Sequence, residues 1–490
     1  MTAANDTEAV GTAGGTATSD TSESPRWDTP AVRWVAVAVL LTLPEVGALV
    51  SFLGATVPVD LGLRALGDAI PTLLSRETIP NQGANVPGSG STTLGLSLGG
   101  WRGPVFGLSP AVAWGLRVVA VYLYGGLWLV WLYRGYWVYR RHYRAADWTP
   151  RDDVLRRFRR HTWGQFGLAV VALFVLSAIF APALGPTTME RNVAEPYSYE
   201  LSYYDEEADT VATTTVGAAN LDSVSQGIED RNVGPMEYDA YGRFHPFGTL
   251  PSGQDLFTAV AMGSRVSLFV GLLAITISGV LAATLAMVSA YYGGVVDLAI
   301  VLLGDATQSL PQLLVVILLS VVLSGTWIAS LYSGGVLLAV IFALTGWPGL
   351  WRAIRGPALQ VSERTWVDAA DSFGQSPETT MRRHILPYVA GYLMVYASMN
   401  LGGIIIGIAG LSFLGLGISP PTPEWGRLVN VGQPFLATTS WHIAVVPGLL
   451  VVIVVTGFNA LGDGVRDAID AEAGVGDEEE ASAAASGAGG

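Results

Sequence analysis

Long apolar runs are the feature that most constrains what this chain can fold into. Eight are present, at roughly 31–54, 110–133, 164–184, 266–290, 296–324, 327–347, 388–416 and 443–463. A run of about 20 apolar residues lets an α-helix cross the hydrocarbon core of a bilayer. Because water is absent from that core, the backbone must satisfy its own hydrogen bonds, and a helix does so within one segment. The sequence therefore predicts an all-α polytopic membrane protein.

Composition agrees with this class and excludes several chemistries. Of the 490 residues, 51% are hydrophobic and only 13% are charged, whereas soluble proteins carry about 25% charged residues. Cysteine and lysine are both absent, which excludes thiolate chemistry and the P-loop, whose lysine contacts the β- and γ-phosphates of ATP. The five histidines are scattered, so we expect no metal site and no cofactor in this chain. A net charge of −14 argues against nucleic-acid binding, which needs a basic surface. An acidic, lysine-free composition resembles that of halophile proteins.

The segments between the apolar runs differ sharply in polarity. Residues 1–30 and 471–490 are rich in small and polar residues, and we expect both to be disordered. The run 61–74 is too short to span a bilayer and is expected to lie at its interface. Pro311 interrupts the run 296–324, which predicts a kinked or broken helix.

Arginine placement predicts the orientation of the spans. The stretch that begins at Arg134 and continues through the linker 135–162 contains nine arginines and three aspartates. Such a basic stretch beside a span belongs in the cytoplasm. With eight spans, both termini are then cytoplasmic. The segment 185–244 contains twelve acidic residues and three arginines and is expected on the extracellular side.

A polar segment, "WVDAADSFGQSPETTMRRHILPYV" at 366–389, separates two apolar runs on the cytoplasmic side. Ser362 is expected to cap a helix that ends at Gly374. Ser376 and Pro377 are expected to start a second helix, which Pro387 ends before the next span. The sequence therefore predicts two short helices joined by a tight glycine turn. An amphipathic hairpin resting on lipid headgroups fits the same pattern, and a DNA-reading helix-turn-helix fits poorly beside two spans.

This segment resembles the EAA loop (362–387) of ABC transporter permeases. The matching residues are Asp368, Ala369, Ala370, Gly374, His384, Leu386 and Pro387, and Asp368 replaces the usual glutamate. Further motifs, including "AYYGGVVDLAI" at 290–300, "GLSFLGLGISPPTPEWGRLV" at 410–429 and "NALGDGVRDAID" at 459–470, resemble the dipeptide, oligopeptide and nickel branch. They are most similar to the second permease of the heterodimeric pair.

The resemblance implies a function and a set of partners. The chain is expected to be one permease of a type I ABC importer, with a second homologous permease, two ATP-binding cassette subunits and an extracellular solute-binding protein. The EAA loop would couple ATP hydrolysis to transport, with ATP and Mg²⁺ bound by the ATPase subunits rather than by this chain. Di- or oligopeptides are the expected cargo, and nickel is the alternative within the branch.

The resemblance also divides the chain. The expected order is a cytoplasmic tail (1–30), an extra transmembrane pair (31–134), the basic linker (135–162), a first core span (163–184), the acidic extracellular insert (185–244), the permease core (245–470) and a C-terminal tail (471–490). The extra pair and the insert lie outside what the resemblance explains. A secondary transporter driven by ion gradients, or a membrane scaffold, remains an alternative, but neither explains the polar segment.

Four polar residues within spans are candidates for function, because charges at that depth are costly. Asp305 and Asn400 lie in spans that line the pathway in the resembled family, although helix–helix hydrogen bonding accounts for them equally well. Glu45 and Arg117 both fall roughly 10–14 Å below the outer boundary, counting 1.5 Å per residue, and are expected to form an ion pair. In the alternative, Arg117 extends outward alone and Glu45 is protonated or faces water.

Overall fold

The computed structural model describes residues 29–48, 108–144 and 150–469, together with scattered positions between 50 and 102. The expected disordered tails and the interfacial run 61–74 fall largely or wholly outside these residues. The chain forms two compact units. The N-terminal unit comprises residues up to Leu43 and the stretch 127–145, and the core unit comprises the rest.

The N-terminal unit pairs α1 (Pro30–Thr42) with the C-terminal half of α4 (Pro110–His142). The indole rings of Trp34 and Trp131 stack at 4.0 Å. Each indole N–H donates to the backbone carbonyl of the other tryptophan, at 3.0 and 2.9 Å. At the end of the pair, the Ala31 amide donates to the Tyr143 hydroxyl at 3.2 Å. These contacts define an antiparallel helix pair.

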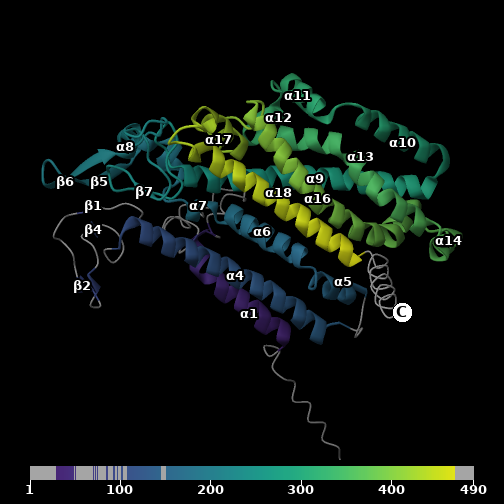
Figure 1. The fold of residues 1–490 in the computed structure, drawn as a ribbon. Coiled ribbons are helices and arrows are strands. Elements are labelled where there is room, and N and C mark those ends of the chain that lie inside the picture. Colours follow the sequence, from purple (N-terminus) through teal and green to yellow (C-terminus); the bar gives the residue numbers. More distant parts are fainter. Residues whose placement is uncertain are drawn as a thin grey trace, which may run out of the picture. The chain divides into compact units, whose positions relative to one another are not determined.

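Long helices make up most of the core unit, and they run side by side in Figure 1. In the described residues of both units together, seven helices are long and apolar enough to cross a membrane, and one bent helix pair brings the total to eight. In the core unit these are α6 (Thr162–Ile179), α9 (Leu256–Tyr292), α13 (Gly335–Ser362), α16 (Leu386–Phe413) and α18 (His442–Ile469), with the pair α10 (Gly294–Ser309) and α11 (Gln312–Val322). The pair bends by 85° at Leu310 and Pro311, so the predicted break there is confirmed.

Shorter elements connect these spans. The helical ones are η2 (Leu43–Glu45), α5 (Pro150–Phe158), α7 (Ala181–Leu184), η4 (Glu190–Ala194), η5 (Pro196–Ser198), α8 (Val216–Asp222), α12 (Trp327–Ser330), η6 (Leu331–Gly334), α14 (Thr365–Ser372), α15 (Pro377–Thr380), η7 (Met381–Ile385), α17 (Trp425–Gly432) and η8 (Gln433–Phe435). The strands form four antiparallel pairs, β1 (Ala84–Asn85) with β4 (Trp101–Arg102), β2 (Thr92–Thr93) with β3 (Leu96–Ser97), β5 (Glu200–Asp205) with β6 (Thr210–Thr215), and β7 (Glu237–Tyr238) with β8 (Phe244–His245).

Small residues bring the spanning helices of the core unit close together. A Cβ added to Gly167 of α6 would lie 2.3 Å from the backbone nitrogen of Leu461 in α18, and one added to Gly164 would lie 2.9 Å from the Cα of Gly464. Without a hydrophobic driving force between helices in lipid, such close approach supplies the van der Waals contact that holds them. A buried face of alanine, serine and glycine lets α9 pack closely against α13 in the same way.

The acidic insert forms an ordered subdomain of the core unit. Its main elements are the β5–β6 hairpin, which pairs Glu200 with Thr215 and Asp205 with Thr210, and the helix α8 that follows it. Figure 1 shows this subdomain at one end of the long helices and α14 at the other. The subdomain extends past residue 244, because residues up to Asp255 at the start of α9 complete its hydrogen bonds.

The region around the EAA-like loop differs from the prediction in three ways. The span α13 continues to Ser362, so Ser362 ends one helix and does not cap the next. The following helix, α14, begins at Thr365 and has Arg364 as its N-cap, which makes no side-chain capping bond. Pro387 does not end the second helix, because the helical stretch continues through the π-helical turn η7 into α16, whose first turn contains Pro387.

Candidate functional site

The first helix of the EAA-like segment, α14, is short and sharply ended. Two backbone hydrogen bonds close its C-terminal end. The Phe373 amide donates to the Ala369 carbonyl at 3.0 Å, and the Gly374 amide donates to the Asp371 carbonyl at 2.9 Å. Gly374 has φ +76°, a conformation that costs other residues about 1–2 kcal/mol. No heavy atom of the described residues lies within 4 Å of a Cβ added at Gly374. The predicted glycine turn is therefore present, and backbone conformation rather than internal packing requires glycine there.

Side chains on the inner face of α14 fix this helix to the spans. Val367 is buried at 3% exposure, and the ring of Trp366 stacks on that of Tyr388 at the start of α16. The Asp371 carboxylate accepts hydrogen bonds from the Tyr291 hydroxyl of α9, at 3.1 Å, and from the buried Thr380 hydroxyl, at 3.4 Å. α14 is thus attached to two different spans. Asp371 carries no role in the sequence-derived site, although it lies next to Ala370 in the motif.

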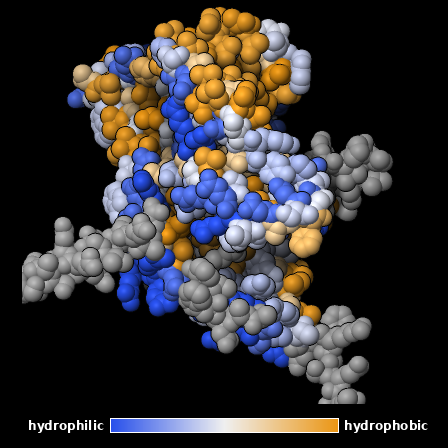
Figure 2. Space-filling model, turned by 90° about the vertical axis from the view of Figure 1, so that its right-hand side faces the viewer, coloured by the Kyte–Doolittle hydropathy of each residue, from blue (hydrophilic) through white to orange (hydrophobic). Residues whose placement is uncertain are grey.

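The outer face of α14 is exposed and small. Asp368, Ala369 and Gly374 are exposed and Ala370 is half-buried. Phe373, at the tip, is 92% exposed, so its ring is accessible to another surface. Figure 2 looks from the side on which α14 lies and shows hydrophilic surface running between hydrophobic regions. The segment thus presents a polar surface with one projecting aromatic ring, which the sequence reasoning did not single out.

The second half of the segment continues directly into a span. Residues 377–413 form one helical stretch, with a π-helical turn at η7. Ile385 and Val389 are fully buried, while His384 and Leu386 are half-buried and Pro387 is exposed. The His384 ring shares a hydrogen bond of 3.1 Å with the Gln375 side chain just after the glycine turn. The second helix of the segment therefore continues into α16 without an intervening loop.

An ion pair beside this segment joins two further spans. The Arg355 guanidinium of α13 donates to both carboxylate oxygens of Asp297 in α10, at 2.8 and 2.5 Å. The Ser289 hydroxyl of α9 donates to the same carboxylate. Bidentate arginine–carboxylate pairs fix orientation as well as distance. This contact gives a physical reason for the family-like stretch 290–300 to contain Asp297.

A large cleft lies between the spans of the core unit. Its volume is about 660 Å³. The polar residues that line it carry no charge, and they are Ser278, Thr307, Gln308, Gln312, Thr345 and Asn400. Asn400, one of the two predicted pathway residues, therefore faces this cleft. Its amide also donates to the Tyr396 carbonyl one turn earlier in the same helix, at 2.8 Å, so this bond joins no second helix.

Asp305, the other predicted pathway residue, is not among the residues that line this cleft. Its carboxylate forms an ion pair with Arg352, which also donates to Gln308 in the wall of the cleft. Both charged side chains are about half exposed, at 52% and 48%. The structure thus places Asp305 beside the cleft, where it orients a residue of the lining.

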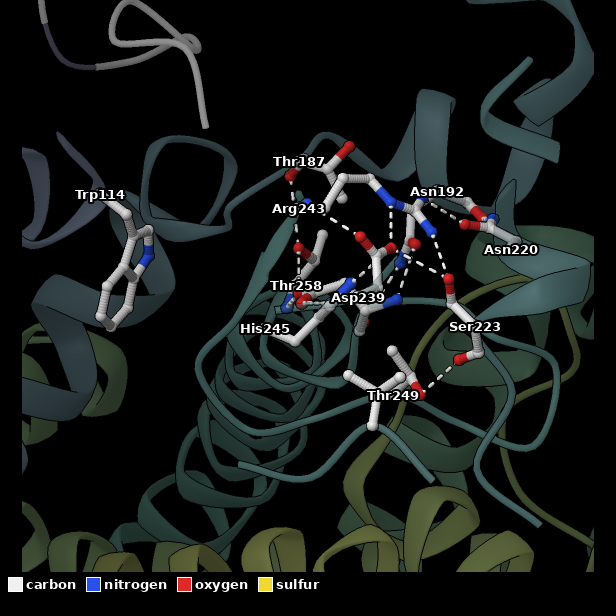
Figure 3. Close-up of polar contacts among 12 residues, drawn as sticks. Trp114, Thr187, Asn192, Asn220, Ser223, Asp239, Arg243, His245, Thr249 and Thr258 are labelled. Atoms are coloured by element: carbon white, nitrogen blue, oxygen red, sulfur yellow. Dashed lines mark hydrogen bonds and ion pairs between the residues drawn. The ribbon is translucent and has the colours of Figure 1, made fainter. Parts of the chain in front are cut away.

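At the other end of the core unit, a buried polar network ties the insert to α9. The His245 ring lies between two carboxylates, with Nδ1 2.9 Å from Asp255 and Nε2 3.3 Å from Asp239. The Arg243 guanidinium donates to Asp239 at 2.6 Å and to Asn220 at 2.7 Å. Figure 3 shows Asn220 of α8, Asp239 and Arg243 from the connection between β7 and β8, and His245 of β8 converging on one another. Sequence reasoning missed this network, although "RFHPFG" and Asp255 stand out as charges near a span start.

Electrostatics in this network favour its charged form. Burial alone lowers the pKa of His245, but the hydrogen bonds that its ring donates to the Asp239 and Asp255 carboxylates outweigh burial, so the pKa is raised above its usual value. Burial alone raises the pKa of Asp239, but the charge of Arg243 and the hydrogen bond with His245 outweigh it and hold that pKa well below its usual range. Burial and a hydrogen bond with Asp222 raise the pKa of Tyr241 to about 12. Both shifts thus favour the network with His245 protonated and Asp239 ionised.

Glu45 and Arg117, the predicted ion pair, both belong to the core unit. Arg117 is buried, with 2% exposure. The Glu45 carboxylate accepts a hydrogen bond of 2.5 Å from the Leu74 backbone amide. The pairing of the two side chains stays a prediction.

Comparison with known proteins gives two family matches. Residues 275–474 match the family described as the binding-protein-dependent transport system inner membrane component, and residues 149–205 match the N-terminal transmembrane domain of oligopeptide transport permease C. The chain is 32% identical over 322 residues to the glutathione transport system permease protein GsiD of Escherichia coli O6:K15:H31, which covers 66% of this chain and 90% of the relative. The same figures hold for its counterparts in Shigella boydii and Shigella sonnei.

Proposed function

We propose that this chain, which belongs to the dipeptide and oligopeptide branch of the ABC transport permeases, couples ATP hydrolysis to import through α14. In this proposal the outer face of α14 and the ring of Phe373 enter a cleft of an ATP-binding subunit. Two such subunits, a second permease and an extracellular solute-binding protein complete the importer, and both termini of this chain lie in the cytoplasm.

This proposal rests on one observation: α14 has one exposed face and one face attached to the spans. It is exposed on one face, with Phe373 at 92% exposure, yet its inner face is attached to α9 through Tyr291 and to α16 through Trp366 and Tyr388. A hairpin that only rested on lipid headgroups would have no need of such attachments. A short helix attached to two spans in this way can transmit a displacement to both of them.

The cargo we propose is a short peptide. The cleft beside Asn400 offers amide and hydroxyl groups, which can donate to and accept from peptide bonds, and its lining carries no charge that would select a metal cation. The similar proteins named above are described as glutathione permeases, and glutathione is itself a tripeptide. This cleft would form half of the pathway, with the second permease supplying the other half.

Reconstitution tests this proposal. The chain is co-expressed with the genes of its two ATPases, the second permease and the binding protein, and the complex is placed in proteoliposomes. We expect radiolabelled di- or tripeptide uptake that requires both ATP and the binding protein. Uptake driven by an ion gradient without ATP would contradict the proposal and favour a secondary transporter. Failure of the ATPase subunits to co-purify with this chain would contradict the coupling role.

A further inference from the structure

A groove runs along the N-terminal unit, which lies outside both family matches. It lies between α1 and the part of α4 after Leu127, and its volume is about 610 Å³. On α1 the lining recurs at positions 30, 33, 34, 37 and 41, and on α4 at positions 127, 130, 131, 134, 138 and 142. These spacings of three and four residues mark one face of each helix. The groove is therefore formed by two facing helix stripes.

The groove is firmly braced. The stacked indoles of Trp34 and Trp131, with an angle of 6° between their planes, lie in its wall. Their reciprocal N–H bonds to backbone carbonyls fix the separation of the two helices. A Cβ added to Gly135 would lie 2.5 Å from the Trp34 ring, so glycine permits this close approach. A groove held open in this way needs little ordering when a ligand binds.

The two ends of the groove differ in chemistry. Arg33, Arg134 and His142 line one end. Leu127 and Val130 line the other, and each is 54% exposed. Counting along α4, Arg134 lies seven residues from Leu127, which is about 10 Å of helix. The groove thus combines a cationic end with an apolar channel of about the length of several methylene groups.

The cationic end belongs at the membrane surface. With 33 residues, α4 is about 50 Å long, and the hydrocarbon core is about 30 Å thick. Its last turns therefore reach the headgroup region. Trp137 lies in these turns and Tyr143 directly follows them, and aromatic rings are typical of the interface. The arginines of the groove consequently meet phosphate groups rather than hydrocarbon.

We infer that this groove binds one anionic phospholipid, with the phosphate at Arg33 and Arg134 and an acyl chain along Leu127 and Val130. Basic pockets between transmembrane helices at the membrane surface recognise anionic headgroups. The groove has a cationic half and an apolar half, in the order of a lipid's own headgroup and acyl chain. This arrangement favours a lipid over an apolar helix, which would bring no negative charge to the arginines. The extra helix pair would then make assembly or activity depend on anionic lipid.

Native mass spectrometry of the delipidated full chain in detergent tests this inference. Dioleoylphosphatidylglycerol is titrated against the zwitterionic dioleoylphosphatidylcholine. We expect one tightly bound phosphatidylglycerol, weakened about fivefold in Arg134→Gln, since each arginine near a headgroup contributes on the order of 1 kcal/mol. Val130→Trp, which fills the apolar half without changing charge, should weaken binding as well. The matched control is Arg141→Gln, because Arg141 packs over the Trp137 ring and does not line the groove.

Several outcomes would overturn the inference. Equal affinity for phosphatidylcholine would remove the role of charge. Equal weakening by Arg141→Gln would show a general surface attraction rather than a site. Displacement of the lipid by an equal concentration of inorganic phosphate would show a simple anion site without an acyl channel. Exposed arginines and Val130 are replaced here, so each variant is expected to fold, and thermal unfolding of each confirms this separately from binding.

Discussion

Replacement of His245 by glutamine should loosen the insert selectively. The ring of His245 is 3% exposed and lies between Asp239 and Asp255, which are 8% and 2% exposed. Glutamine removes the positive charge that both carboxylates share. Breaking a buried charge network by removing one partner costs about 3–5 kcal/mol. Because Asp239 keeps Arg243 and Asp255 keeps the backbone and hydroxyl of Thr258, we expect the lower value, about 3 kcal/mol.

Hydrogen–deuterium exchange measures this loss where it occurs. A loss of about 3 kcal/mol in the free energy of local opening accelerates exchange about a hundredfold. The acceleration should appear in peptides from residues 216–255 and not in peptides from α13. The matched control is His384→Gln, which replaces a half-buried histidine at the other end of the core unit and should leave exchange in the insert unchanged. Less than a threefold change in His245→Gln would refute the reasoning.

The pH dependence of the same exchange follows from the two pKa shifts. Because the folded pKa of His245 is raised, its contribution to stability is complete below the unfolded pKa of about 6.5 and is lost as the pH rises through the folded value. Because the folded pKa of Asp239 is depressed, its contribution is complete above about pH 4 and is lost only in stronger acid. Protection factors of the insert, corrected for intrinsic rates, should therefore fall as the pH rises over the range above about 6.5. Constant or rising protection over that range would contradict the charged network.

Three further predictions concern the same end of the molecule. Gly253→Ala should destabilise the insert by about 3 kcal/mol, because its φ is +74° and the added Cβ would lie 1.6 Å from a backbone oxygen; exchange of the insert no faster than in the wild type would contradict this. Residues 200–215 can be deleted cleanly, because the flanking Val216 amide already donates to the Tyr199 carbonyl at 2.9 Å. This deletion should impair delivery of cargo from the binding protein but leave the ATPase subunits bound in a pull-down. If Glu45 and Arg117 pair, a charge-swapped double variant should melt above both single reversals, and a double variant no more stable than either would rule the pair out.

The spans could be predicted from the sequence because their signal is local. A run such as 266–290 is apolar over a length that a bilayer requires, and Pro311 carries its own reason for a break. The ends of the helices were less predictable. Ser362 has the chemistry of an N-cap, but the span before it continues through that residue, because helix packing overrides local capping preference.

The site could be predicted only as far as a motif records it. Gly374 was identified because a left-handed backbone position favours glycine regardless of context. The anchor from Asp371 to Tyr291 joins residues 80 positions apart, and no local pattern reports such a distance. The same holds for His245 and Asp255, whose meeting depends on how the insert folds back onto the start of α9.

The most direct test of coupling compares two glycine variants with the same backbone cost. Gly374 and Gly415 have φ of +76° and +77°, and an added Cβ at either meets no described atom within 4 Å. Gly374 lies at the tip of α14, whereas Gly415 follows the opposite end of α16. We expect Gly374→Leu to abolish ATP-driven peptide uptake in proteoliposomes while the ATPase subunits still hydrolyse ATP, and Gly415→Leu to retain uptake. Normal uptake by Gly374→Leu would contradict the coupling role of α14.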